Sequence, residues 1–69
     1  MKLRDLGLPK SEIIRIADEW VWNKRDKAIL IMKMEGSTYE EIAESLCLST
    51  QYVKELYLAS RNLIIEHSR

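Results

Sequence analysis

The chain contains few of the residues that interrupt helices and few that form covalent cross-links. Its 69 residues include one proline, two glycines, one cysteine and no phenylalanine. Glycine and proline are the residues least compatible with a helix interior, so their scarcity favours long helices joined by few turns. The single cysteine, Cys47, excludes a disulfide within these residues and a metal site built from several cysteines.

Long apolar runs are also absent. The longest uncharged apolar run, residues 28–32, is far shorter than the roughly 20 residues that a transmembrane helix needs. No apolar stretch that would serve as a signal peptide follows Met1. We therefore expect a cytoplasmic protein with no membrane partner.

An excess of charge of either sign is missing as well. The chain has 11 Lys and Arg and 11 Asp and Glu, so its net charge is zero. Eight of the basic residues lie in positions 1–35, which leaves the second half acidic. A DNA-binding surface ordinarily shows a basic footprint, because phosphate contacts supply much of the affinity. Such a footprint would have to come from the first half of this chain.

The length and the apolar pattern predict one small helical domain, residues 1–69, with residues 1–8 as a loose lead-in. A chain this short buries only about 60% of its unfolded surface, so dimerisation or partner binding is a reasonable expectation. Apolar residues recur at helical spacing, which predicts an all-α fold. The expected four helices span about residues 10–22, 24–35, 39–46 and 50–66.

The first two expected helices have recognisable ends. Either Pro9 begins the first helix or Ser11 is its N-cap. Asn23 is the expected N-cap of the second helix, with Asp26 as a weaker capping-box partner. The second helix is apolar nearly all round, which predicts a central position, and Gly36 is suited to end it in a left-handed conformation.

The last two expected helices are separated by only three residues, 47–49. Thr38 and Glu41 form a capping box for the first of them, and Ser49 is an N-cap for the second. Two helices joined by so short a turn must cross steeply, as in a helix-turn-helix. A small residue at the crossing, an apolar plug in the turn and an inward residue of the last helix seat this corner: Ala43, Leu48 and Val53.

The apolar residues of the last helix fall into two sets. The expected inward stripe is Val53, Leu56, Ser60 and Leu63. Outside this stripe lie Tyr57, Leu58, Ile64 and Ile65. These four either cover the first helix around Trp20 and Trp22 or form a homodimer seam in the C-terminal half. We expect both tryptophans to serve core and edge packing, with base stacking as the alternative.

Four segments, residues 23–30, 35–43, 46–49 and 53–54, carry a resemblance to a known family. They resemble the C-terminal helix-turn-helix, region four, of RNA-polymerase sigma factors, and the short sigma-region-four-like proteins of phages and other mobile elements. The resemblance implies that the last helix enters the major groove of double-stranded DNA, and that RNA polymerase is a further partner. In that family a glycine usually stands where this chain has Cys47, at a position where other residues are strained.

The resemblance also implies which side chains meet DNA. The base-facing residues would be Thr50, Gln51, Lys54 and Glu55, whose side chains suit the thymine methyl, adenine, guanine and cytosine respectively. The resemblance places Thr38, Tyr39 and Tyr52 at the DNA backbone. From their charge and position we also expect backbone contacts from Lys24, Arg25 and Lys27. These residues predict a DNA-binding transcription regulator.

The acidic residues of the motif support a second hypothesis, in which the chain is a phage-type protein-interaction module. Such a module would keep the fold but present an acidic face formed by Glu40, Glu41, Glu44 and Glu55. It would act as an inhibitor or adaptor of a host polymerase, a sigma factor or a defence nuclease. The simpler interpretation of Glu40 and Glu41 is charge that complements the helix dipole.

Catalytic chemistry is not expected. The only histidine, His67, lies near the end of the last helix, where it would complement the helix C-terminus rather than act as a base. The sequence has no nucleophile–base or metal-ligand spacing. Cys47 is expected to be a small hydrophobic residue in a turn rather than a nucleophile. We therefore expect no enzyme, no cofactor and no metal.

Overall fold

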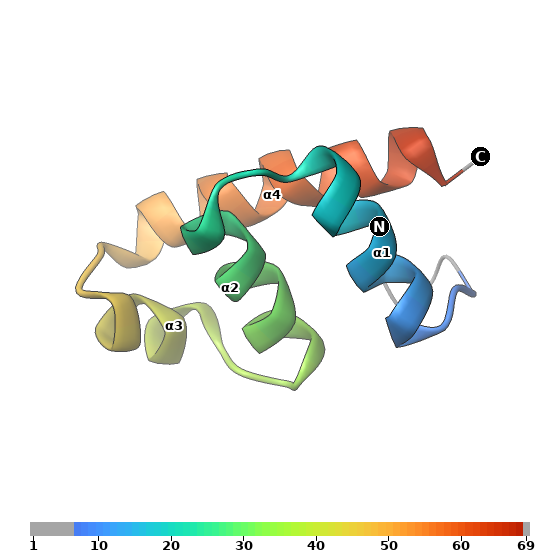
Figure 1. Cartoon of the computed structure of the whole chain (residues 1–69). Coiled ribbons are helices and arrows are strands. Elements are labelled where there is room, and N and C mark those ends of the chain that lie inside the picture. Colours follow the sequence, from blue (N-terminus) through green and yellow to red (C-terminus); the bar gives the residue numbers. More distant parts are fainter. Residues whose placement is uncertain (1–6, 69) are drawn as a thin grey trace.

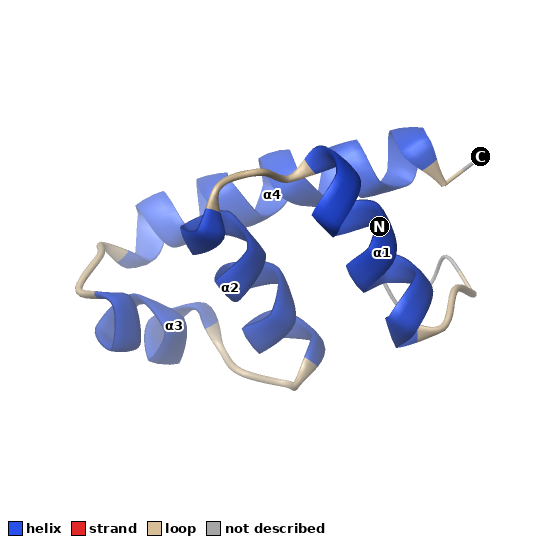
Figure 2. Cartoon of the chain, viewed as in Figure 1, coloured by secondary structure: helices blue, strands red, loops and turns tan. Residues whose placement is uncertain are grey.

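Four helices make up the part of the chain that this computed structural model describes, residues 7–68. They are α1 (Lys10–Trp20), α2 (Lys24–Met34), α3 (Tyr39–Leu46) and α4 (Thr50–His67), and no strand lies among the described residues (Figure 2). The expected all-α, four-helix domain is confirmed. Most of the expected lead-in, residues 1–6, lies outside the described residues, whereas Leu8 packs against the core.

The starts of α1 and α2 follow from local hydrogen bonds. The carbonyl of Pro9 accepts the backbone N–H of Ile13 at 3.2 Å, so Pro9 rather than Ser11 precedes α1. The side chain of Asn23 accepts the backbone N–H of Arg25 at 2.8 Å, which confirms the expected N-cap of α2. The carboxylate of Asp26 accepts instead from Nε of Arg25, at 3.2 Å.

The first helix ends two residues earlier than expected, at Trp20. Val21 adopts an extended conformation, with φ −112° and ψ 96°, while its backbone N–H still donates to Ala17. This conformation allows the Val21 side chain to be buried in the core. The helix therefore ends where burying a β-branched side chain contributes more free energy than one further helical turn would.

The long helix α4 forms one side of the molecule, and the other three helices pack against it (Figure 1). Of these three, α2 lies in the middle and contacts both α1 and α3. The predicted central position of the second helix is therefore confirmed. No helix among residues 7–68 combines the length and the apolar character needed to cross a membrane.

The core draws on all four helices, but the buried face of α4 differs from the expected one. Its buried residues are Val53, Tyr57, Ser60 and Ile64. Leu56 is half-buried and packs against the core, whereas Leu63 is exposed, so the expected inward position is wrong for Leu63. The observed stripe follows spacings of four, three and four residues, which keep side chains on one helical face. Tyr57 and Ile64, expected either to cover the first helix or to form a homodimer seam, are buried in the core.

The two tryptophans are more exposed than expected for core and edge packing. Trp22 is 79% exposed, and its indole N–H donates to the carbonyl of Glu19 at 2.6 Å. Trp20 is 43% exposed and stacks on His67, with ring centroids 3.7 Å apart. Val21, between them, is buried in the core.

Candidate nucleic-acid interface

The two helices of the motif begin with the expected caps. The backbone N–H of Glu41 donates to the Thr38 hydroxyl at 3.1 Å, and the Thr38 N–H donates to the Glu41 carboxylate at 2.9 Å. This reciprocal pair is a complete capping box for α3. At the start of α4 the backbone N–H of Tyr52 donates to the Ser49 hydroxyl at 3.1 Å. The start of α3 can therefore be traced to two side chains, Thr38 and Glu41, and that of α4 to one, Ser49.

The turn between α3 and α4 depends on a left-handed residue. Cys47 has φ 57° and ψ 42°, and among residues 7–68 it is the one non-glycine with a positive φ. The N–H of Leu48 donates to the carbonyl of Ala43 at 2.9 Å, and the N–H of Cys47 to that of Glu44 at 3.3 Å. This pattern is a Schellman motif, which normally uses glycine. Leu48 then packs against the core as the expected apolar plug.

The backbone of Cys47 predicts that Cys47→Gly stabilises the protein by about 0.5 to 1 kcal/mol, because a side chain in the left-handed region costs about 1 kcal/mol or more. Part of this gain is lost to the greater freedom of glycine in the unfolded chain. Urea unfolding followed by circular dichroism measures the difference. Gly36→Ala is the matched control: Gly36 ends α2 with φ 98°, so alanine there should destabilise by a similar amount. If Cys47→Gly were less stable than the unaltered chain, the inferred backbone strain at Cys47 would be contradicted.

Hydrogen bonding to the capping box lowers the pKa of Glu41, first through the backbone N–H of Thr38 and then through its side chain. A carboxyl whose pKa is lower in the folded state stabilises above its unfolded pKa and loses that contribution as the pH falls through its folded pKa. We therefore expect Glu41→Gln to lower the melting temperature at neutral pH, and the gap from wild type to close in acid. Thermal melts at several pH values test this, with Glu40→Gln as the exposed neighbouring control. A gap that does not depend on pH would contradict it.

The expected base-facing residues share one exposed side of α4. Thr50, Gln51, Lys54 and Glu55 are all exposed, whereas Val53 is fully buried on the opposite side. The Gln51 side-chain amide donates to the Glu55 carboxylate at 3.3 Å, one helical turn along. The structure thus presents all four polar side chains to solvent from the first two turns of a helix whose inner side is anchored.

The middle helix α2 places a cation over a tyrosine at the start of each motif helix. The guanidinium of Arg25 lies 5.3 Å from the ring centroid of Tyr52, in the first turn of α4. The ammonium of Lys33 lies 4.3 Å from the ring centroid of Tyr39, the first residue of α3. Both distances are within the range of cation–π attraction. Two residues expected at the DNA backbone, Tyr39 and Tyr52, are therefore each combined with a basic group.

Lys33 was not among the residues expected at this interface. It was overlooked because the contact with Tyr39 depends on how the glycine turn after α2 redirects the chain. Tyr39 also meets the ring of Tyr57 edge-on, with centroids 5.8 Å apart. Burial, and to a lesser extent Tyr39, raises the pKa of Tyr57, whereas Arg61 lowers it. The shift reflects the inward position of Tyr57 beneath the pair.

Lys24 and Lys27, also expected at the DNA backbone, differ in exposure and in ion pairing. Lys24 is exposed next to Arg25 at the start of α2. Lys27 is half-buried and forms an ion pair with Asp18 of α1, with Nζ 3.2 Å from Oδ1. Lys27 is therefore partly neutralised by α1, and its availability to phosphate is lower than that of Lys24.

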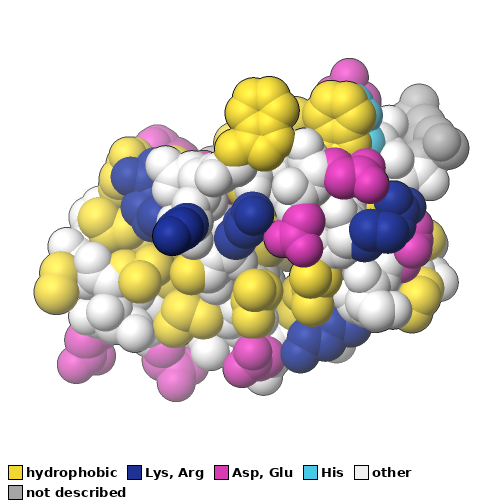
Figure 3. Space-filling view, viewed as in Figure 1, with side chains coloured by type: hydrophobic (Ala, Val, Ile, Leu, Met, Phe, Trp, Pro, Cys, Tyr) yellow, Lys and Arg dark blue, Asp and Glu magenta, His cyan; other side chains and the backbone are white. Residues whose placement is uncertain are grey.

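The acidic residues named for the alternative function are exposed on α3 and α4. Glu40, Glu41, Glu44 and Glu55 are all exposed, although the Glu41 carboxylate is engaged by the capping box. In the view of Figure 3, Lys and Arg gather over the start of α2, whereas Asp and Glu follow the lower edge below α3. The motif therefore has a basic flank supplied by α2 and an acidic flank along α3.

Within residues 7–68 no group of three or more His, Cys, Asp or Glu side chains is arranged to hold a metal ion. Cys47, whose thiol is exposed, lies in the turn rather than beside a base. Comparisons with protein-family models, curated proteins and solved structures find no match for this chain.

Proposed function

We propose that this chain binds double-stranded DNA through α3 and α4, with α4 in the major groove, and regulates transcription as a sigma-region-four-like protein. The observation that carries the proposal is the pairing of Arg25 with Tyr52 and of Lys33 with Tyr39. Each pair brings a positively charged group to the start of one motif helix, where it would meet phosphate. Between them lies the exposed polar side of α4.

The two cations lie near opposite ends of α2, and each is held over a tyrosine of a different motif helix. Arg25 and Lys33 are eight residues apart on α2, which corresponds to about 12 Å along a helix axis. An arginine stacked on a tyrosine ring keeps N–H groups that can donate to phosphate, and so does a lysine. The pairs would hold the chain on the two phosphate rows while Gln51 and Lys54 read base edges.

Binding should be weak and moderately dependent on salt. The cations expected to meet phosphates are Lys24, Arg25, Lys33 and Lys54. About four phosphate contacts give a slope of roughly −3 to −4 in a plot of log affinity against log salt. This is a smaller dependence than that of strongly basic DNA-binding proteins, in agreement with the net charge of zero.

A fluorescence anisotropy titration of labelled duplex DNA at several salt concentrations tests the proposal. We expect the double variant Arg25→Gln with Lys33→Gln to reduce the slope by about two and to weaken binding about 10- to 100-fold at low salt. The matched control is Lys10→Gln, an exposed lysine at the start of α1. Absence of binding by the unaltered chain at about 100 μM and low salt would overturn the proposal, because even non-specific binding is usually detectable there.

The exposed glutamates of α3 favour a second candidate, the protein-interaction module. The eight residues of α3 include three glutamates and no basic residue. In this reading the acidic flank meets a basic surface of a host polymerase or of another nucleic-acid-binding protein and takes the place of nucleic acid. Purified RNA polymerase, tested for direct binding in the absence of DNA, separates this candidate from the first.

A further inference from the structure

Trp20, Trp22 and Leu63 form an exposed apolar patch, here called the tryptophan patch, where the end of α1 meets the last turns of α4. These side chains are 43%, 79% and 36% exposed respectively. Trp20 stacks on His67, and Leu63 precedes His67 by four residues, which places it on the same side of α4. Figure 3 shows large hydrophobic side chains projecting together from the upper edge, with the histidine beside one of them.

Contacts within the chain fix the positions of both tryptophan side chains. The indole N–H of Trp22 is bonded to the carbonyl of Glu19 at 2.6 Å, and the ring planes of Trp20 and His67 differ by only 2°. A side chain that is already ordered loses little entropy when it becomes buried in an interface. Tryptophan is also among the residues that contribute most to binding energy at interfaces.

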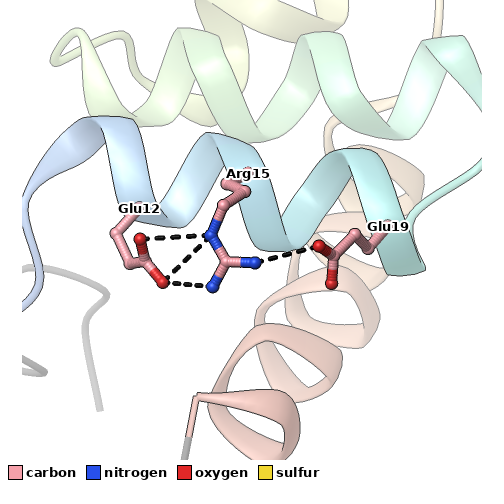
Figure 4. A network of polar contacts seen from close by, with 3 residues as sticks. All are labelled: Glu12, Arg15 and Glu19. Atoms are coloured by element: carbon pink, nitrogen blue, oxygen red, sulfur yellow. Dashed lines mark hydrogen bonds and ion pairs between the residues drawn. The ribbon is translucent and has the colours of Figure 1, made fainter.

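Several of the charges near the tryptophan patch are paired within the chain. Arg15 bridges Glu12 and Glu19 along α1, with Nη1 2.9 Å from Oε1 of Glu19 (Figure 4). The neighbouring Asp18 is paired with Lys27 of α2. These pairs leave little net field to attract nucleic acid or another strongly charged partner. These five side chains carry two positive and three negative charges, and the whole chain has no net charge, so little long-range repulsion separates two copies.

From this charge balance we infer that the tryptophan patch binds the same patch of a second copy of this chain. A two-fold pair buries one patch against the other, which is the isologous arrangement of most homodimers. The two indoles of one copy expose roughly 300 Å², given that a tryptophan buries up to about 250 Å². A standard interface needs about 800 Å² per partner, so the paired rim must supply the rest. The dimer is therefore weak, with a dissociation constant of about 10 to 100 μM.

The position of the patch leaves the DNA-facing side of α4 free in the dimer. Leu63 and His67 follow the exposed residues 50–55 by about 12 residues, or roughly 18 Å along the helix. Two copies joined at their patches would hold these faces up to about 36 Å apart, close to one turn of B-DNA. This match in spacing rests on the proposed DNA-binding function, whereas the self-association does not.

Sedimentation equilibrium of the full chain without DNA tests the dimer. The average mass should rise from 8.1 kDa toward twice that value as the concentration rises. A range of about 10 to 500 μM brackets the expected dissociation constant. Trp22→Lys and Leu63→Lys should each weaken association at least about 10-fold, because they place a charge in the buried centre of the interface. Both residues are exposed, and circular dichroism would verify that the variants remain folded.

The control is Ser45→Lys, which adds the same charge to an exposed position on α3, away from the patch. This variant should associate as the unaltered chain does. A constant mass of 8.1 kDa up to about 500 μM, or full association by both patch variants, would overturn the inference. Since the measurement contains no DNA, failure of the proposed function would leave its outcome unchanged.

Discussion

Replacing Glu44 and Glu55 together by lysine should tighten binding to duplex DNA by about 10- to 100-fold at low salt. Both residues are exposed on the motif helices, Glu44 on α3 and Glu55 on the polar side of α4. Each replacement removes a repelled anion and adds a cation that can meet a phosphate. Two additional phosphate contacts should make the salt slope steeper by about two.

The control for this charge reversal is the double variant Glu19→Lys with Glu66→Lys. It changes the net charge by the same amount at exposed positions near the ends of α1 and α4, away from the motif turn. An equal gain in affinity for both double variants would mean that net charge, rather than the face of α3 and α4, governs binding. If the chain is instead a protein-interaction module, Glu44→Lys with Glu55→Lys should weaken its binding to the partner protein.

Ile29→Ala is expected to destabilise the fold by about 2 to 4 kcal/mol, because it removes three carbon atoms from the centre of the core. Ile29 is fully buried on α2, which, like α4, contacts each of the other three helices. A domain of this size has a total unfolding free energy of about 3 to 10 kcal/mol. The variant should therefore lose a large part of its stability, and the urea concentration at its unfolding midpoint should be well below that of the unaltered chain.

Urea unfolding followed by circular dichroism measures this loss. Ile31→Ala supplies the matched control, because Ile31 is the same residue type on the same helix but only half-buried. Ile31→Ala should lower the free energy of unfolding by less than half as much as Ile29→Ala. An equal loss of unfolding free energy at the two positions would contradict the packing of the Ile29 side of α2 into the core.

The helix positions and their caps could be predicted because the interactions that set them are local. The capping box of Thr38 and Glu41, the N-caps at Asn23 and Ser49, and the left-handed residue Cys47 each involve atoms at most a few residues apart. The chemistry of those side chains selects the same backbone conformation wherever such a helix end occurs. The end of α1 was less predictable, because Val21 leaves the helix to be buried against other helices.

The candidate interface was only partly predictable for a related reason. Exposure of Thr50, Gln51, Lys54 and Glu55 follows once Val53 is recognised as inward, since these residues share one helix. Lys33 could not be linked to Tyr39 from sequence, because the two lie on different helices whose relative position depends on the whole core. The ion pair of Lys27 with Asp18, which reduces its availability to DNA, was likewise not apparent.

By itself the sequence determined an all-α chain of four helices, with the caps and the short left-handed turn that separate them, because hydrogen bonds between near neighbours decide these features. Only the tertiary structure decided that Tyr57 and Ile64 rather than Leu56 and Leu63 are buried on α4, and that Trp22 stays in solvent. The apolar residues of α4 surround most of the helix, so their spacing allows more than one inward face. The packing of the other three helices against α4 decides which of these faces is buried, because each apolar residue buried there leaves water.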